Sequence, residues 1–207
     1  MVRKIVIILI LLIAFSSSAC ASYHPSDNTA PVDPPPFRDD AFTPNEEGLF
    51  EVIIPENLLG GGTAESFVNR ALTNQGFMEV ITDVFYNNDG SATIVLTMEQ
   101  LLEYRYSMHQ YGQLHLNTNG YWSIKAVIYE KRDLTEITVW VDYDLYLRYG
   151  MDRLASNSVL AVYAGTFQIL SGVAPDDWHT TITVRDYITD EIITSYYFPN
   201  ENMYRSY

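Results

Sequence analysis

Cysteine is nearly absent from this chain of 207 residues, because Cys20 is the only one. A chain with a single thiol cannot close an internal disulfide, so its folded part depends on its core alone. Positive charge is also scarce: 12 Lys and Arg residues stand against 26 Asp and Glu residues, which gives a formal net charge of −14. Such a surface repels polyanions, so we exclude nucleic acid as a ligand.

The chain also lacks the motifs that mark common hydrolases and zinc enzymes: it has no G-x-S-x-G, no H-E-x-x-H and no Cys–His arrangement. None of its histidines has the spacing of zinc ligands, and we interpret them as solvated or capping residues. They are His24, His109, His115 and His179. We therefore expect no metal and no cofactor.

Three other segments are weak candidates for a site. The run Gly60 to Gly62 precedes a predicted helix, but no Lys follows it, so a mobile loop is favoured over a phosphate loop. The carboxylate pairs Asp142 with Asp144 and Asp176 with Asp177 could serve acid–base chemistry or bind a cation. Carboxylates are plentiful here, so neither pair is a strong indication.

The N-terminus is typical of an export signal. Arg3 and Lys4 precede an apolar stretch from Ile5 to Phe15, which is too short to span a bilayer. The residues that follow, Ser17-Ser18-Ala19-Cys20, resemble a bacterial lipobox, whose cysteine receives a diacylglyceryl group and becomes the first residue of the mature chain. We therefore predict a signal peptide over residues 1–19 and lipidation of Cys20. Loss of Arg3 and Lys4 with the signal changes the formal charge from −14 to −16.

An alternative is cleavage by ordinary signal peptidase at the small residues Ala19 and Ala21, which would release a secreted protein. A lone cysteine at the end of the signal favours the lipoprotein, since two acyl chains hold a protein on a membrane stably. The predicted location is the outer face of the plasma membrane.

Residues 20–47 are predicted to form a lipidated cysteine followed by a disordered tether. This segment holds six of the nine prolines, and no apolar periodicity is visible in it. Fully extended at roughly 3.1 Å per residue, it would reach on the order of 80 Å. Residues 48–207 then form one globular domain.

Hydrophobic periodicity predicts an α+β domain: mainly antiparallel sheet built from hairpins, in the order β-α-β-β-α-β-β-α-β-β, with about three helices packed against it. In chain order, the expected elements are strand 49–54, helix 64–74 with Thr63 as its N-cap, hairpin 77–98, helix 99–114, hairpin 120–143, helix 145–170 and hairpin 178–198. In the first hairpin, parity favours a turn with Gly90 in a left-handed bulge.

The middle hairpin carries the candidate binding patch. An even-length connection, residues 131–134, would put Lys125 opposite Trp140 on the outward face. Tyr121, Lys125, Tyr129 and Trp140 would then form an aromatic patch suited to stacking on sugars or to gripping a protein partner. Alternatively, a helix covers this face and the rings form a second core layer, or Lys125 rests on Trp140 as a cation–π pair.

Several stretches resemble uncharacterised small lipoproteins of Gram-positive Firmicutes. They are the lipobox with its Pro-rich tether, "FEVIIPENLLGG", "NNDGSATIVLTMEQLLEY", "IYEKRDLTEITVWVD" and "YAGTFQILSG". The resemblance implies a domain outside a Gram-positive plasma membrane. It implies no activity, cofactor or catalytic residue.

The sequence favours a non-enzymatic interaction module, anchored to the membrane, that binds an envelope protein or glycan. Two alternatives stay open: a cell-wall-directed hydrolase that uses acidic residues, and a structural lipoprotein that self-associates through its tyrosine-rich surface.

Overall fold

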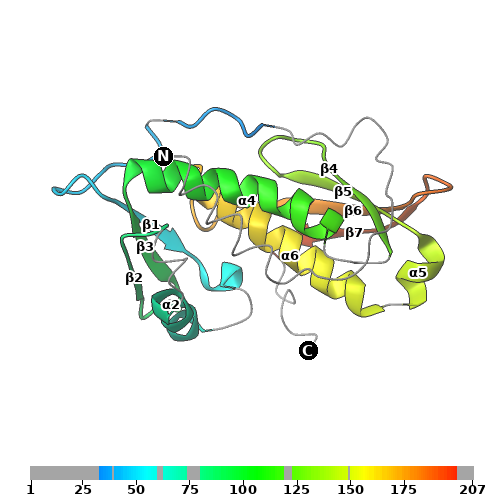
Figure 1. Cartoon of the computed structure of the whole chain (residues 1–207), viewed down its shortest axis with the longest axis horizontal. Coiled ribbons are helices and arrows are strands. Elements are labelled where there is room, and N and C mark those ends of the chain that lie inside the picture. The colour runs from blue at the N-terminus through cyan, green and yellow to red at the C-terminus, as the bar shows by residue number, and fades with distance from the viewer. Residues whose placement is uncertain are drawn as a thin grey trace.

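The structure, a computed structural model, describes residues 33–38, 40–59, 63–73, 80–118, 123–148 and 150–199. Its strands form two sheets (Figure 1). The small sheet is antiparallel with the order β1-β3-β2 and consists of β1 (Phe50–Ile54), β2 (Asp83–Tyr86) and β3 (Ala92–Leu96). The large sheet has the order β4-β5-β6-β7 and consists of β4 (Ile124–Tyr129), β5 (Glu136–Val141), β6 (Thr180–Asp186) and β7 (Ile192–Phe198).

Two long helices, α4 and α6, lie against each other and hold the sheets together (Figure 1). Helix α4 also contacts β3 and β4, and α6 contacts β1 and β6. The helical elements are η1 (Glu56–Leu58), α2 (Ala64–Thr73), α4 (Met98–Thr118), α5 (Tyr143–Arg148) and α6 (Gly150–Ile169). This arrangement confirms the predicted α+β class. None of the described helices is long and apolar enough to cross a membrane.

Side-chain caps fix where two of the helices begin. The Thr63 hydroxyl accepts a hydrogen bond from the Ser66 amide at 3.1 Å, as predicted for the N-cap of α2. Helix α4 begins with a reciprocal pair: Thr97 Oγ1 accepts from the Gln100 amide at 3.2 Å, and Gln100 Oε1 accepts from the Thr97 amide at 2.9 Å. Both backbone donors at this helix start are thereby satisfied.

The hairpin of the small sheet has the predicted register. Gly90 has a φ of +89°, and Val84 lies opposite Ile94. Val84 and Ile94 are both buried, so the predicted parity of this hairpin is confirmed.

Gly165 allows the close approach of elements from both sheets. It lies in α6, and a Cβ at this position would come within 2.6 Å of Leu58 Cδ2 and 2.8 Å of Trp178 Cε3. Leu58 belongs to η1, which follows β1, whereas Trp178 comes just before β6. Both side chains are almost fully buried in one continuous core.

The large sheet differs from a series of hairpins at its centre. Strands β5 and β6 pair in parallel, with Val139 opposite Val184. The helical connection between them returns the chain to the starting edge, which makes the second strand parallel to the first. The single helix predicted over 145–170 is instead α5 and α6.

The predicted tether does not run free up to residue 47. Phe37 and Phe42 stack with their ring centroids 6.2 Å apart and pack against the core. Ala41 lies so close to Gly172 that a Cβ on this glycine would be 2.3 Å from that of Ala41. The packed unit therefore begins upstream of the predicted boundary at residue 48.

Candidate binding surface

A β-bulge at Lys125 decides which side chains of the middle hairpin face outward. The register shifts between Ile124 and Ala126, so that Ala126 lies opposite Trp140, and Tyr129 lies opposite Ile137. An extra residue in one strand reverses the face of every residue after it. The predicted pairing of Lys125 with Trp140 is therefore wrong.

The bulge also places Tyr129 in the core. Its side chain is 6% exposed, and its ring meets that of His109 edge to face with centroids 5.4 Å apart. The predicted outward position of Tyr129 is thus wrong as well. No sequence pattern indicated the bulge, because Lys125 fits the polar position of a regular strand equally well.

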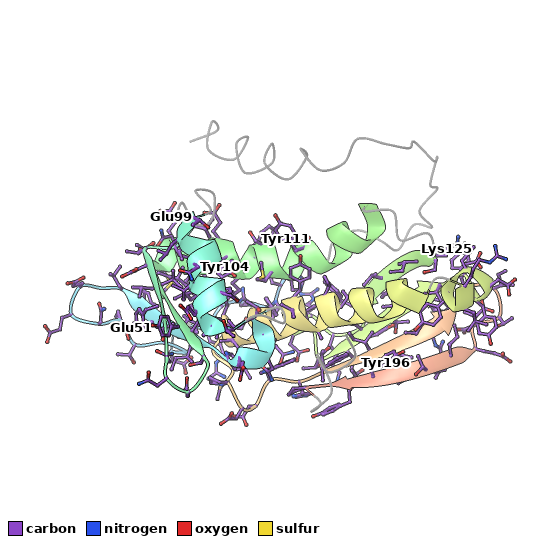
Figure 2. All side chains as sticks on the ribbon, turned by 90° about the horizontal axis from the view of Figure 1, so that it is seen from below. Glu51, Glu99, Tyr104, Tyr111, Lys125 and Tyr196 are labelled. Atoms are coloured by element: carbon purple, nitrogen blue, oxygen red, sulfur yellow. The ribbon has the colours of Figure 1, made fainter. Side chains whose placement is uncertain are left out.

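Lys125 lies at the end of the sheet beside α5 (Figure 2). Its Nζ is 3.8 Å from Asp142 Oδ2, and both side chains are about one-third exposed. Asp142 also caps α5, since its Oδ1 accepts a hydrogen bond from the Leu145 amide at 3.2 Å. The fourth residue of the predicted patch, Tyr121, lies outside the described residues. Of the three patch residues that the structure describes, Trp140 alone lies on the open face.

The face of the large sheet away from the helices is open in the part of the chain that the structure describes. Figure 2 shows α4 and α6 on one side of β6 and β7, and the other side bare. The strand registers place three rows of side chains across this face: Glu130, Glu136, Thr181 and Tyr197; Ile128, Thr138, Thr183 and Ser195; Ala126, Trp140, Arg185 and Ile192.

A groove of about 450 Å³ lies on this face, and eight of these twelve residues line it. Thr138, Thr181 and Thr183 line it. Next to it on the same face, Thr183 Oγ1 is 3.3 Å from Ser195 Oγ. Trp140 lies on one side of the hydroxyl row, and its buried indole N–H has no hydrogen-bond partner among the described residues.

The groove has charged groups of both signs. At one end, Glu136 Oε1 lies 2.5 Å from Lys131 Nζ, and Glu130 lies beside Glu136. At the other end, the Arg185 guanidinium lies 5.6 Å from the centroid of the Trp140 ring and pairs with Asp190. The Glu136 carboxylate holds the pKa of Lys131 above its usual value through a hydrogen bond and charge attraction. The two ends are about 13 Å apart, since four residues of β5 separate Glu136 from Trp140.

The remaining predicted site residues do not assemble. Asp144, Asp176 and Asp177 are exposed. His179 is also exposed, and its ring stacks on Tyr197 at 6.3 Å. Among the described residues, no group of three His, Cys, Asp or Glu side chains could hold a metal ion. Several predicted features lie outside the described residues: the Gly60–Gly62 run, His24, Cys20 and the signal peptide.

A buried polar cluster on α4 escaped the sequence analysis. His109 is fully buried; its Nε2 lies 3.1 Å from the Arg132 carbonyl oxygen, to which it donates, and its Nδ1 accepts from Gln110 at 3.3 Å. Burial, together with the nearby positive charge of Arg105, lowers the pKa of His109 to about 4. The hydrogen bond to the Arg132 backbone and the negative charge of Asp33 act in the opposite direction but are smaller than the effect of burial. The prediction that His109 is solvated is therefore wrong, since this imidazole is buried and neutral.

Arg105 lies one turn before His109 and is 5% exposed. Its Nε donates to Ser171 Oγ at 2.8 Å, and its Nη2 donates to the Pro35 carbonyl at 2.6 Å. Its guanidinium carbon lies 4.9 Å from the Phe167 ring centroid and 5.8 Å from that of Phe37. Burial lowers the pKa of this guanidinium. The spacing of Leu101, Arg105 and His109, each four residues apart, was the signal that these polar groups share the buried side of α4.

Comparison with known proteins gives no relative: no family model, no curated protein and no solved structure matches the chain. The candidate site thus depends on the geometry of the open face.

Proposed function

We propose that the chain is a lipoprotein held by Cys20 on the outer face of a plasma membrane, and that it binds a neutral or basic glycan in the groove of its open sheet face. The anchor is supported by the export signal and by the lone cysteine that follows it.

The groove is the observation that carries the ligand class. A sugar chain presents hydroxyl groups and apolar C–H faces, and the groove is lined by Trp140 and by the threonines Thr138, Thr181 and Thr183. Tyr197 lies on the same face, opposite Thr181 on the neighbouring strand. Binding sites commonly combine aromatic walls with a few well-placed polar groups. Trp140 and Tyr197 are two strands and four residues apart, or roughly 16 Å, which suits an extended chain of several sugars.

The negative charge of the chain restricts the class of glycan further. With a formal charge of −16 after loss of the signal and two glutamates in the groove, the mature chain repels a polyanionic glycan and tolerates a neutral or amine-bearing one. The test is calorimetric titration of the mature chain carrying Cys20→Ser with three probes: an N-acetylhexosamine oligomer, its deacetylated amine form and a uronic-acid oligomer.

The expected result is binding of the first two probes and none of the third. Trp140→Ala should weaken binding at least about tenfold, the equivalent of 1.4 kcal/mol. Tyr86→Ala is the matched control, since Tyr86 is an exposed aromatic residue on the small sheet. Equal loss in both variants, or tightest binding to the uronic-acid oligomer, would refute the ligand assignment.

A wall-directed hydrolase is a second candidate, because Glu130 and Glu136 line the same groove. General acids in glycosidases lie in apolar surroundings, whereas the Glu136 side chain is 51% exposed and salt-bridged to Lys131. Binding without turnover is therefore favoured. Release of reducing ends from any probe, abolished by Glu130→Gln, would instead support the enzyme.

The anchor has its own test. Mass spectrometry of the native mature protein should find an N-terminal Cys20 carrying acyl mass, and Cys20→Ala should move the protein into the culture medium. A native N-terminus at Ala21 without a lipid would support secretion instead.

A further inference from the structure

Two carboxylates lie side by side at one end of the groove. Tyr129 lies opposite Ile137, so Glu130 and Glu136 form the next pair of opposed residues, and the Glu130 amide donates a hydrogen bond to the Glu136 carbonyl oxygen at 3.0 Å. Both residues line the groove, so their side chains lie on the same face. Like charges directly opposite each other on antiparallel strands are destabilising. This end of the groove therefore favours a positive charge.

The chain supplies one positive charge there itself, on Lys131. Its Nζ lies 2.5 Å from Glu136 Oε1. A hydrogen bond to Glu136 and the negative charges of Glu136 and Asp133 hold the pKa of Lys131 above its usual value, so the side chain is protonated at neutral pH. Glu130 takes part in no ion pair among the described residues. One cation thus serves two carboxylates of the groove.

The ion pair between Lys131 and Glu136 is easily opened. Both side chains are about half exposed. Ion pairs between exposed side chains contribute little to stability, and a lysine carries its charge on a flexible stem. The backbone of the connection has hydrogen bonds of its own, such as the one that the Leu134 amide donates to the Lys131 carbonyl oxygen at 3.0 Å. The Lys131 ammonium can therefore turn into solvent while the groove keeps its shape.

We propose that Lys131 determines how the groove discriminates between neutral and amine-bearing sugars: in the free protein its ammonium occupies the position beside Glu136 that a ligand amine takes on binding. This inference rests on the proposed glycan groove. An N-acetyl sugar has no charge to exchange for Lys131 and binds through Trp140 and the threonines. An amine-bearing sugar has to displace Lys131 before it reaches Glu136. The lysine thus weakens a preference for amines that the two glutamates would otherwise create.

Removal of the lysine charge tests this competition. Calorimetric titrations in a Cys20→Ser background compare an N-acetylhexosamine oligomer with its deacetylated amine form at about pH 6, where amines are protonated and glutamates are ionised. Lys131→Gln should bind the amine oligomer roughly fivefold more tightly, the effect of one unit charge at about 4 Å in water. Its affinity for the N-acetyl oligomer should be unchanged. Lys131→Arg keeps the charge and should not show the gain.

Arg38→Gln is the matched control, because it removes the same charge from another exposed ion pair. Arg38 Nη2 lies 3.2 Å from Asp40 Oδ2. The segment that contains Arg38 is bound through Pro35 to Arg105 of α4, and α4 lies on the side of the large sheet away from the groove (Figure 2). This variant should leave both affinities unchanged. In about 1 M salt, where the Debye length is about 3 Å, the gain of Lys131→Gln should largely disappear.

The outcomes separate the role of Lys131 from the glycan assignment. If the parent chain binds neither oligomer, the groove is not a glycan site and both proposals fail. If the parent chain binds the N-acetyl oligomer but Lys131→Gln does not raise the affinity for the amine form, only the role of Lys131 is refuted. An equal gain in Arg38→Gln would also refute it, since the net charge of the whole chain would then be the cause.

Discussion

Arg105 donates a hydrogen bond from Nη2 to the carbonyl oxygen of Pro35, a residue 70 positions earlier in the chain, over 2.6 Å. The same guanidinium binds Ser171 and lies against Phe167 and Phe37. One buried cation thus joins α4, the end of α6 and a segment that the sequence assigned to the tether. We call residues 33–38 and 40–42 the strap.

Loss of this cation should destabilise the protein. Arg105→Gln should lower the free energy of unfolding by roughly 2–4 kcal/mol, because it leaves partners of charged hydrogen bonds unsatisfied in a buried place. Urea denaturation measures the change. Phe37→Ala is the companion variant, and in the double mutant the two losses should fall short of their sum, since both residues belong to one contact. Full additivity would contradict a strap held by Arg105.

His109 should make the fold sensitive to mild acid. Its pKa falls from 6.5 to about 4 on folding, so the unfolded chain binds more protons than the folded one between these values. The stability contributed by the neutral imidazole is therefore complete above pH 6.5 and is lost as the pH falls towards 4. The loss amounts to about 3 kcal/mol. His109→Gln should flatten this part of the profile relative to the parent protein in urea midpoints measured from pH 7 to pH 4. An unchanged slope would show that other groups cause the acid sensitivity.

Gly165→Ala should be among the most damaging single-methyl additions. The new Cβ would meet Leu58 and Trp178 at 2.6 and 2.8 Å, well inside van der Waals contact. Overpacking of this kind costs roughly 1–3 kcal/mol. Adding Leu58→Ala should return part of the loss, measured as a double-mutant cycle in thermal or urea unfolding. A Gly165→Ala protein as stable as the parent would contradict the close approach of these side chains.

Thr97 should contribute measurably to the start of α4. Thr97→Ala removes one half of the reciprocal pair with Gln100 and should cost about 1 kcal/mol. Thr97→Ser keeps the oxygen and should retain most of the stability. If both variants behave alike in urea unfolding, the hydroxyl does not cap the helix.

Local signals in the sequence predicted the fold class, the N-cap Thr63 and the parity of the first hairpin. Each of these depends on neighbours in sequence: a hydroxyl three residues from an amide, or a glycine in a turn with a positive φ. The predicted register of the middle hairpin is wrong because the register depends on a bulge and on Leu134. Leu134 lies in the connection, has a φ of +60° and buries its side chain. Neither feature has a residue type that requires it.

The parts of the candidate site that the sequence missed depend on distant pairings. Trp140 and Arg185 become neighbours only through the parallel pairing of β5 with β6. Arg105 looks like an ordinary solvated helix residue until the core packs around it. Composition and periodicity contain no information about such contacts.

The strap limits how far the domain can stand from its proposed lipid anchor. Since Pro35 is fixed to α4, only residues 21–34 could bridge the gap, and fourteen residues span at most about 50 Å. The full tether predicted from the sequence, up to residue 47, would instead reach about 80 Å when extended. Ligands within the lower part of a surrounding wall would thus be accessible to the groove, and those farther out would have to come to it.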